Sequence, residues 1–458
     1  MNLRRAGLRA LSIAMGCTWI FACGDDGEAT GGAGGSGGDT NLAPELAAPE
    51  TLVIGEGRSA VSAIEATDPE GDELSISVEA PSGIDAEVSE SSLLLHAIFG
   101  ADSGIATITA TDSLGASTTA ETAIQIATLG WTNTVEWNEG EGPEAREHGS
   151  VLVDDASGSI YVMFGSGYSP YLEPLGDAWR FDVATGTWSA VTLEGDVPPP
   201  GGSRRLAGRR GSGEGYIYGG YGENNAGFGE VYHVVANGDV LTFEEVPQDN
   251  PPGIRFLHVF AFDPGTETFA MFGGGSTTLE GDTWTMRIED GTAVWTELPD
   301  ADASPPKRFG AFFGMDEELG RLVLFSGQTS FSDEFGDDTW ILDMRAEGGP
   351  AWTEVSPDPS PPGRRNGTSV WDPTGPRLFV FGGTSDGATT QPGLFAFDAR
   401  PGHEGWAEVE RDGQPVLRSS GFGAFVANGD ELASAVWMGF GNSSDGVYQD
   451  MSRLGYSE

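Results

Sequence analysis

The sequence predicts an all-β protein in which a β-sandwich precedes a propeller of six repeated sheets. Three observations lead to this prediction. The 458-residue chain contains 70 Gly and 27 Pro, a composition typical of short strands joined by tight turns. After residue 49, apolar and polar residues alternate through short runs, as in strands with one buried face. From residue 131 onward a motif recurs at an interval of roughly 50 residues, which is typical of propeller sheets.

Residues 1–22 are expected to form a signal peptide. Arg4, Arg5 and Arg9 precede an apolar run from Ala10 to Ala22, which is too short to span a bilayer of about 30 Å as a helix. The run ends in Ile20-Phe21-Ala22-Cys23, which resembles the lipobox of bacterial lipoproteins. This resemblance implies lipidation of Cys23, and ordinary signal cleavage is the alternative.

Residues 23–48 are rich in Gly and small polar residues, so we expect a flexible, disordered tether. Cys17 and Cys23 are the only cysteines of the chain, and Cys17 would leave with the signal peptide. The exported part would then contain no disulfide framework. We therefore expect a protein lipid-anchored to the bacterial cell envelope, at the outer membrane or cell surface, with no other membrane contact.

The chain is strongly acidic, with 70 Asp and Glu against 23 Lys and Arg and a formal net charge of −47. Such a charge repels nucleic acid and favours solubility. We expect a monomer that binds no nucleic acid, and whose partner is a protein or a glycan.

Residues 49–128 show short period-two runs separated by Gly, Pro and Asp turns, which predict a sandwich of about seven strands. The stretches "ATDPEGDELSISV" and "TITATDSLGAS" resemble cadherin-like, immunoglobulin-type modules of bacterial surface proteins. Four carboxylates of these stretches could supply oxygen ligands for Ca²⁺. Alternatively, the first three simply form a turn that bonds its own backbone. The four residues are Asp68, Glu70, Asp72 and Asp112.

Residues 129–458 carry the repeat. Five units begin at a Pro-x-x-Arg corner, and the second has a variant one residue longer, from Pro200 to Arg204. An alternating strand then leads to an aromatic-glycine element such as Phe272-Gly273-Gly274. The next strand opens with an acid and an aromatic residue, such as Asp282-Thr283-Trp284, a pattern that is degraded in the last two units. A further strand carries a large aromatic residue, for example Trp352. The corner arginines are Arg146, Arg204, Arg255, Arg308, Arg364 and Arg418. This pattern resembles the kelch-repeat family, whose fold is a β-propeller.

The count of repeats predicts how the propeller closes. Six aromatic-glycine elements are present, but the last unit ends without its aromatic strand. The stretch around Trp137 precedes the first corner as Trp352 precedes Pro361. We therefore expect the strand around Trp137 to complete the last blade of a six-bladed propeller and to remove two open sheet edges.

The corner arginines allow two interpretations. Since they start the innermost strands, they could ring one mouth of the channel and bind a carboxylate, a sulfate or an acidic peptide. Alternatively, each is structural and bonds carbonyl groups or an acid such as Asp177, Glu230, Asp282 or Asp338. The loops of the same face add aromatic anchors for a partner. These candidate residues are Tyr168, Tyr171, Tyr221 and Phe331.

No catalytic motif stands out. Galactose oxidase, a kelch relative, needs a cysteine for its copper site, and residues 129–458 contain none. We therefore expect no cofactor other than the Ca²⁺ considered above. Kelch-type sialic acid mutarotases share the six-blade plan, and an Arg beside Glu173 or Glu334 could perform acid–base chemistry on an acidic sugar. The sequence thus predicts a binding or scaffold protein, with such a propeller enzyme as the alternative.

Overall fold

The computed structural model of the protein describes residues 19–22, 41–89, 91–138, 140–168, 172–299, 303–332, 334–386, 389–409, 411–430 and 432–456. Within these ranges every regular element is a strand except the 3-10 turn η1 (Glu223–Asn225), so the chain is all-β, as predicted. None of the described segments is a helix long and apolar enough to cross a membrane. The chain divides into two compact units, Met1–Thr128 with Glu458, and Leu129–Ser457.

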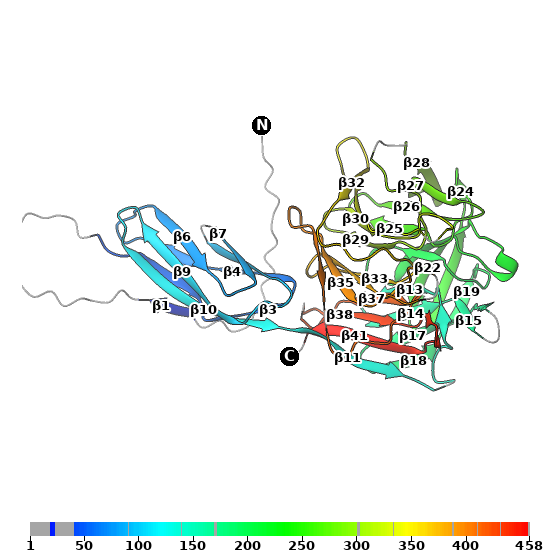
Figure 1. The fold of residues 1–458 in the computed structure, drawn as a ribbon, viewed down its shortest axis with the longest axis horizontal. Helices are drawn as coiled ribbons and strands as arrows, with labels where there is room; N and C mark the ends of the chain where they lie inside the picture. The colour runs from blue at the N-terminus through cyan, green and yellow to red at the C-terminus, as the bar shows by residue number, and fades with distance from the viewer. Residues whose placement is uncertain are drawn as a thin grey trace, which may run out of the picture. The chain divides into compact units, whose positions relative to one another are not determined.

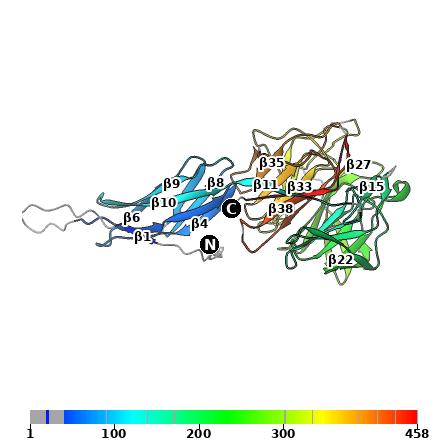
Figure 2. The ribbon, with the colours of Figure 1, turned by 90° about the horizontal axis from the view of Figure 1, so that it is seen from below.

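The first unit consists of strands in three described sheets (Figures 1 and 2). The four-stranded sheet has the order β3 (Thr51–Gly55), β10 (Ser117–Ala127), β9 (Gly104–Asp112), β6 (Leu74–Glu79). One three-stranded sheet has the order β4 (Arg58–Ala63), β8 (Ser92–Ala97), β7 (Ile84–Ser89), and the other β1 (Trp19–Ala22), β2 (Glu45–Pro49), β5 (Glu65–Thr67).

One hydrophobic core joins these sheets, because alternate residues of each strand point inward. Leu93 and Leu95 of β8 pack with Ile108 of β9 and Ile124 of β10, and all four are at most 1% exposed. Leu46 of β2 belongs to the same core. The strand β2 begins at Glu45, inside residues 23–48, where we expected only a tether, and ends at Pro49. Its apolar residues find partners in this core. Residues 23–40, including Cys23, lie outside the described residues.

The second unit contains six larger sheets in its described residues. The first sheet has the order β13 (Ser150–Asp154), β14 (Ser159–Met163), β17 (Ala178–Asp182), β18 (Thr187–Ala190), and the second the order β20 (Arg205–Ala207), β21 (Glu214–Tyr218), β22 (Val231–Asn237), β23 (Val240–Val246), β19 (Thr192–Gly195). The third sheet has the order β25 (Val259–Asp263), β26 (Thr268–Gly275), β27 (Leu279–Glu289), β28 (Thr292–Glu297), β24 (Gln248–Asp249), and the fourth the order β29 (Phe312–Asp316), β30 (Arg321–Phe325), β31 (Thr339–Asp343), β32 (Ala351–Val355). The fifth sheet has the order β33 (Thr368–Asp372), β34 (Arg377–Phe381), β35 (Leu394–Asp398), β36 (Gly405–Glu408), and the sixth the order β37 (Phe422–Val426), β38 (Ala435–Gly439), β41 (Asp450–Tyr456), β11 (Leu129–Glu136). Short strands lie in the loops: β12 (Arg146–Glu147), β15 (Ser166–Tyr168), β16 (Leu172–Pro174), β39 (Asn442–Ser443) and β40 (Gly446–Val447).

The first strands of the six sheets contact one another in a circle. The strand β13 contacts β20, β20 contacts β25, β25 contacts β29, β29 contacts β33, β33 contacts β37, and β37 contacts β13 again. The corners lie at the beginnings of these strands and the hairpins to the second strands lie at their ends. The circle therefore has a corner face and a hairpin face.

The last sheet combines the two ends of this unit. The strand β11 pairs antiparallel with β41 in the register Leu129↔Tyr456 to Glu136↔Asp450, and the two strands lie side by side in Figure 1. Trp137 follows β11 directly and packs against Phe440, with ring centroids 5.4 Å apart. The strand expected around Trp137 therefore pairs with the strand that contains Asp450.

Large aromatic residues fill the spaces between neighbouring sheets, because wide rings bury much apolar surface in a wedge. Trp352 on β32 packs against Phe272 of the preceding sheet at 5.3 Å and donates to Thr283 Oγ1 at 3.0 Å. Trp406 on β36 repeats this arrangement with Phe325 and Thr339. The aromatic residue of the fourth strand therefore binds the sheet before it. In the last sheet this residue is Trp131 of β11, whose ring lies 5.7 Å from Phe381, and not Trp137, as the sequence comparison with Trp352 predicted.

Candidate functional site

The six corner arginines are buried, with only 1 to 7% of their surface exposed. Arg308 shows why this burial is tolerated. Its Nη1 and Nη2 donate to Oδ1 and Oδ2 of Asp338 at 2.6 Å each, Nη1 also donates to the Ser326 carbonyl at 3.0 Å, and Nε donates to the Pro306 carbonyl at 2.9 Å. A buried charge is stable when it is paired and hydrogen-bonded in this way.

The carboxylate of this pair is held from two sides. Trp340 Nε1 donates to Asp338 Oδ2 at 2.6 Å. Burial alone would raise the pKa of Asp338, but the hydrogen bonds and charge of Arg308 outweigh it, so the pKa is lowered. Three other corners have the same kind of pair: Arg146–Asp177, Arg255–Asp282 and Arg418–Asp450.

Arg204 and Arg364 use aromatic rings instead of an acid. The guanidinium of Arg204 lies 4.1 Å from the ring centre of Phe228, and that of Arg364 lies 5.1 Å from Phe395. Their other partners are carbonyl groups such as those of Pro199 and Pro392. Since no strong acid pair offsets their desolvation, burial lowers the pKa of both arginines to about 10.

The corners also connect neighbouring sheets through the backbone. At five of the six junctions a glycine of the aromatic-glycine element donates its N–H to the corner carbonyl of the next sheet, for example Gly274 to Arg308 at 2.8 Å. At the junction of the first and second sheets, Gly165 donates to the Gly201 carbonyl instead. The last of these bonds, from Gly441 to Arg146 at 2.9 Å, connects the sixth sheet to the first. The side chain of a corner arginine thus fastens its own sheet while its carbonyl fastens the previous one, as the structural interpretation predicts.

A different group of side chains gathers at the centre of the corner face. Most of these residues follow a corner arginine by one or two positions. We call the group the mouth cluster, and it consists of Glu147, His148, Arg205, Tyr221, Phe256, Phe309, Arg365 and Asn442. These residues come from all six repeats. Several are paired through short bridges, such as Phe309 with Gln328 and Arg365 with Thr384.

Contacts join the mouth cluster around the circle. Asn442 Nδ2 of the sixth repeat donates to Glu147 Oε2 of the first. The Tyr221 ring lies 5.9 Å from the Phe256 ring, and the Arg365 guanidinium lies 5.0 Å from the Phe309 ring centre. Phe256 and Phe309 belong to one apolar cluster. Side chains that are distant in sequence therefore form one continuous surface.

Glu147 is the acid of this surface. It is 5% exposed, and this burial raises its pKa to about 7. Burial also raises the pKa of Tyr221, with a smaller contribution from the charge of Glu147. A carboxyl group with a pKa near neutrality can both donate and accept a proton, which is the property that acid–base chemistry requires.

Arg205 and Arg365 are the cations of the cluster. Burial, together with the charges of Arg205 and Arg365, lowers the pKa of His148 to about 3, so His148 is neutral at pH 7. Arg205 Nε donates to the carbonyl of His258 at 3.0 Å. The mouth cluster therefore combines two guanidinium groups, one titratable acid, amide groups and aromatic rings.

Comparison with known proteins identifies the repeat. Residues 266–457 match the family model described as the KLHDC2/KLHL20/DRC7 Kelch-repeats domain. This match supports kelch repeats in the second unit, and we call that unit, Leu129–Ser457, the kelch domain. The solved structure titled "Structure of YjhT" is similar to this chain with a TM-score of 0.50 and 13% identity, covering 70% of this chain and 99% of that one. This likeness supports a kelch propeller fold and nothing about activity. No curated protein matches the chain.

The predicted site residues of the kelch domain have different positions. Tyr221 is in the mouth cluster, and Phe331 is 65% exposed with its ring 6.1 Å from that of Phe309. The side chain of Tyr168 and the whole of Tyr171 lie outside the described residues. Glu173 and Glu334, considered for acid–base chemistry, are both exposed.

Sequence reasoning selected the corner arginines and missed the residues next to them. Glu147 and Arg365 each follow a corner arginine directly. The repeat itself contains the signal, because a position that is constant across repeats is structural, whereas the next position varies among Glu, Arg, Phe and Ser. In the kelch domain this variable position supplies the mouth cluster.

The carboxylates considered for Ca²⁺ lie in the first unit and bond the backbone. Asp68 Oδ1 accepts the N–H groups of Glu70 and Asp72 at 2.9 Å each. Asp112 Oδ1 accepts those of Leu114 and Ala116. These are the contacts of the turn interpretation. Among the described residues no group of three or more His, Cys, Asp or Glu side chains could hold a metal ion.

Proposed function

We propose that this protein is a lipid-anchored binding or scaffold protein of the bacterial cell envelope, at the outer membrane or cell surface. In this proposal Cys23 carries the lipid, and residues 49–128 form a cadherin-like, immunoglobulin-type spacer. The kelch domain is a six-bladed propeller that binds a protein or glycan partner at its corner face. The protein acts as a monomer, binds no nucleic acid and contacts the membrane only through its lipid.

The proposed six-bladed propeller is supported by the circle of first strands and by the pairing of β11 with β41. Each of the six sheets contributes four consecutive strands of the repeat pattern, with β11 serving as the fourth strand of the last. Closure in this way leaves no free edge between the first and last sheets. A ring of this kind is a rigid support for side chains at its mouth.

The observation that carries the binding proposal is the convergence of side chains from all six repeats in the mouth cluster. The guanidinium of Arg365 lies 5.0 Å from the ring centre of Phe309, and a guanidinium is the group that recognises a carboxylate through two parallel hydrogen bonds. Tyr221, Phe256 and the 65%-exposed Phe331 add amphipathic and apolar surface of the kind that dominates binding energy. An acidic glycan or an acidic peptide has the matching chemistry.

One observation favours an enzyme as the second candidate. The pKa of Glu147 is raised to about 7 by burial, and Tyr221 lies close enough for the charge of Glu147 to raise its pKa. A proton donor and acceptor beside cationic arginines could act on an acidic sugar, for instance as a mutarotase or epimerase. Turnover, rather than binding, would distinguish this candidate.

The test is a screen of the mature, full-length chain against arrays of acidic glycans and acidic peptides, followed by variants. Arg365→Ala should weaken binding of a hit by about tenfold or more. The matched control is Arg287→Ala, which removes the same charge from an exposed position on β27. Equal binding by both variants, with their melting temperatures unchanged, would refute the proposed site.

Two further measurements complete the test. Conversion of a bound acidic sugar that disappears in Glu147→Gln, while binding remains, would promote the enzyme. For the anchor, the mass of the mature N-terminus should show a lipidated Cys23 as its first residue. A chain that begins elsewhere, or that carries an unmodified Cys23, would refute the anchor and leave the binding proposal intact.

A further inference from the structure

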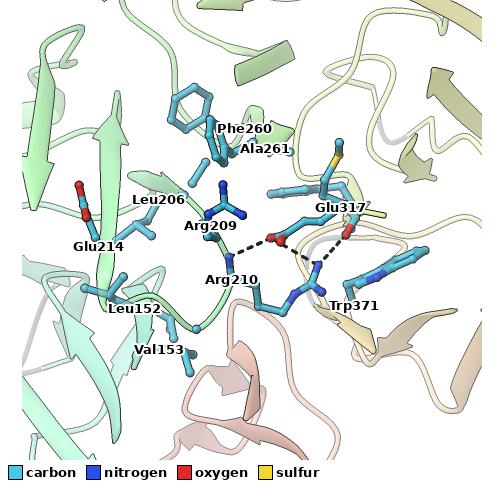
Figure 3. A pocket seen from close by; sticks show the side chains of 18 residues that line it. Leu152, Val153, Leu206, Arg209, Arg210, Glu214, Phe260, Ala261, Glu317 and Trp371 are labelled. Atoms are coloured by element: carbon cyan, nitrogen blue, oxygen red, sulfur yellow. Dashed lines mark hydrogen bonds and ion pairs between the residues drawn. The ribbon is translucent and has the colours of Figure 1, made fainter. Parts of the chain in front are cut away.

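The hairpin face of the kelch domain has a cavity of its own. Its volume is about 200 Å³, equal to about seven waters at about 30 Å³ each. Its walls come from the first strands β13, β20, β25, β29 and β33 and from the turn that follows β20. The apolar lining residues include Leu152, Leu206, Phe260, Phe262, Phe313 and Trp371. Figure 3 labels Leu152, Leu206, Phe260 and Trp371 around the hollow.

An unusual hairpin brings two positive charges to this apolar cavity. The turn between β20 and β21 contains Gly208-Arg209-Arg210-Gly211-Ser212-Gly213, whereas the corresponding turns after β13, β25, β29 and β33 are four residues long. The longer turn extends into the cavity lining. Arg209 and Arg210 both line the cavity.

Arg210 holds this turn in place. Its backbone N–H donates to Glu317 Oε1 at 2.9 Å, and its Nη2 donates to the Met315 carbonyl at 2.7 Å. Both acceptors belong to the fourth sheet, while the turn belongs to the second. Arg210 therefore connects the second and fourth sheets, and its guanidinium already has partners in the protein, as the dashed lines of Figure 3 show.

Arg209 differs from its neighbour. Its side chain is exposed, and its guanidinium makes no hydrogen bond or ion pair with the described residues. The two acids of the cavity are already paired: Glu317 with Arg210 at 3.8 Å, and Glu214 with His233 at 2.8 Å. An available guanidinium therefore stands over an apolar hollow on a chain whose net charge is −47.

We propose that this cavity binds a small carboxylic acid with an apolar chain or ring. The carboxylate would pair with Arg209, because a guanidinium binds a carboxylate with two parallel hydrogen bonds. The apolar part would lie against Phe260, Phe313 and Trp371. An amine would meet the charge of Arg209 unfavourably, and a free inorganic anion would leave the apolar walls uncovered. Arg209 does not belong to the mouth cluster, although Arg205 of that cluster lies 5.6 Å from the ring centre of Phe313 in the cavity wall. The variants Arg209→Gln and Arg365→Ala therefore test the cavity and the proposed function separately.

The probes are benzoate and hexanoate, with benzyl alcohol and hexanol as uncharged controls. Binding to the mature, full-length chain is measured by saturation-transfer NMR and calorimetry at about 0.15 M salt, where the repulsion between the acidic chain and an anion is screened beyond about 8 Å. We expect saturable binding of both acids, mutual competition, and at least tenfold weaker binding of the alcohols.

Arg209→Gln should weaken binding of both acids at least tenfold, because it removes the charge and keeps a polar side chain. Arg287→Gln, at an exposed site on β27 outside the cavity, should leave binding unchanged. Since Arg209 makes no contact that folding requires, the melting temperature of its variant should equal that of the wild type. Absence of saturable binding, equal binding of acids and alcohols, or equal affinity of Arg209→Gln and the wild type would overturn the proposal.

Discussion

The pair between Arg308 and Asp338 allows a quantitative test of the structural role of the corners. Asp338→Asn preserves the shape of the side chain and removes its charge. The guanidinium of Arg308 is 1% exposed, so it would remain buried without its counter-charge. Removing one partner of a buried pair costs about 3 to 5 kcal/mol. Because Arg308 keeps its bonds to the Ser326 and Pro306 carbonyls, we expect a loss near the lower limit, about 3 kcal/mol.

Calorimetry of the mature chain measures this loss. For a unit of this length, about 3 kcal/mol corresponds to a decrease in melting temperature of about 4 °C. The control is Glu334→Gln, which removes a charge from an exposed position of the same loop. If both variants melt at the same temperature, the ion pair does not stabilise the kelch domain and the assignment of the corners is wrong.

The pH dependence of the same pair has a definite sign. The pKa of Asp338 is lower in the folded protein than its usual value. Its contribution to stability is therefore complete above the unfolded pKa of about 4 and disappears as the pH falls through the folded pKa. The difference in stability between the wild type and Asp338→Asn should shrink over this acidic range and stay constant from pH 5 to 7.

Three further perturbations have expected outcomes. Because the pKa of Glu147 is raised to about 7, ionisation of Glu147 destabilises the fold as the pH rises from about 4.5 to 7. Above pH 7, Glu147→Gln should therefore be more stable than the wild type by up to about 3 kcal/mol, as measured by denaturation across this range. Gly441→Ala should lower the free energy of unfolding by more than about 2 kcal/mol, because positive φ costs about 1 to 2 kcal/mol and the new Cβ would clash with the Ser419 carbonyl. The control Gly429→Ala, also at positive φ but with open space around it, should lower it by about 1 kcal/mol. Similar melting temperatures of the two variants would contradict this expectation. The hydroxyl oxygens of Thr134 and Ser452 are 3.2 Å apart, so the double variant Thr134→Cys/Ser452→Cys should form a disulfide that stabilises the oxidised chain by up to about 5 kcal/mol. An oxidised form no more stable than the reduced one would show that β11 and β41 are not paired.

The sequence was sufficient to predict the repeat and the strand that pairs with β41. The regular interval of corners and aromatic-glycine elements reflects a structural demand that is the same in every sheet, and such demands are visible as periodicity. The acids proposed as partners were correct for Arg146, Arg255 and Arg308. Glu230 was not: its carboxylate accepts the Gly229 N–H, and Arg204 stacks on Phe228. The second corner has one more residue between its proline and arginine, which changes the position of the guanidinium.

The mouth cluster could not be predicted for a physical reason. Corner backbones are irregular, so sequence alternation does not tell which of two adjacent residues, such as Arg364 and Arg365, faces inward. The structure buries Arg364 to 1% exposure and directs Arg365 to the ring of Phe309. Likewise, the formation of the strand β2 depends on packing partners far along the chain, which local composition does not reveal.

The pairing of β11 with β41 has a consequence for how the protein is made. These strands comprise residues 129–136 and 450–456. The first strand of the kelch domain to be synthesised therefore has no pairing partner until the last strand has been synthesised. Any product of interrupted translation, or of trimming at the C-terminus, retains two unpaired strand edges. Unpaired strand edges pair with other chains and lead to aggregation. A chain that contains both β11 and β41 covers these edges and avoids this outcome.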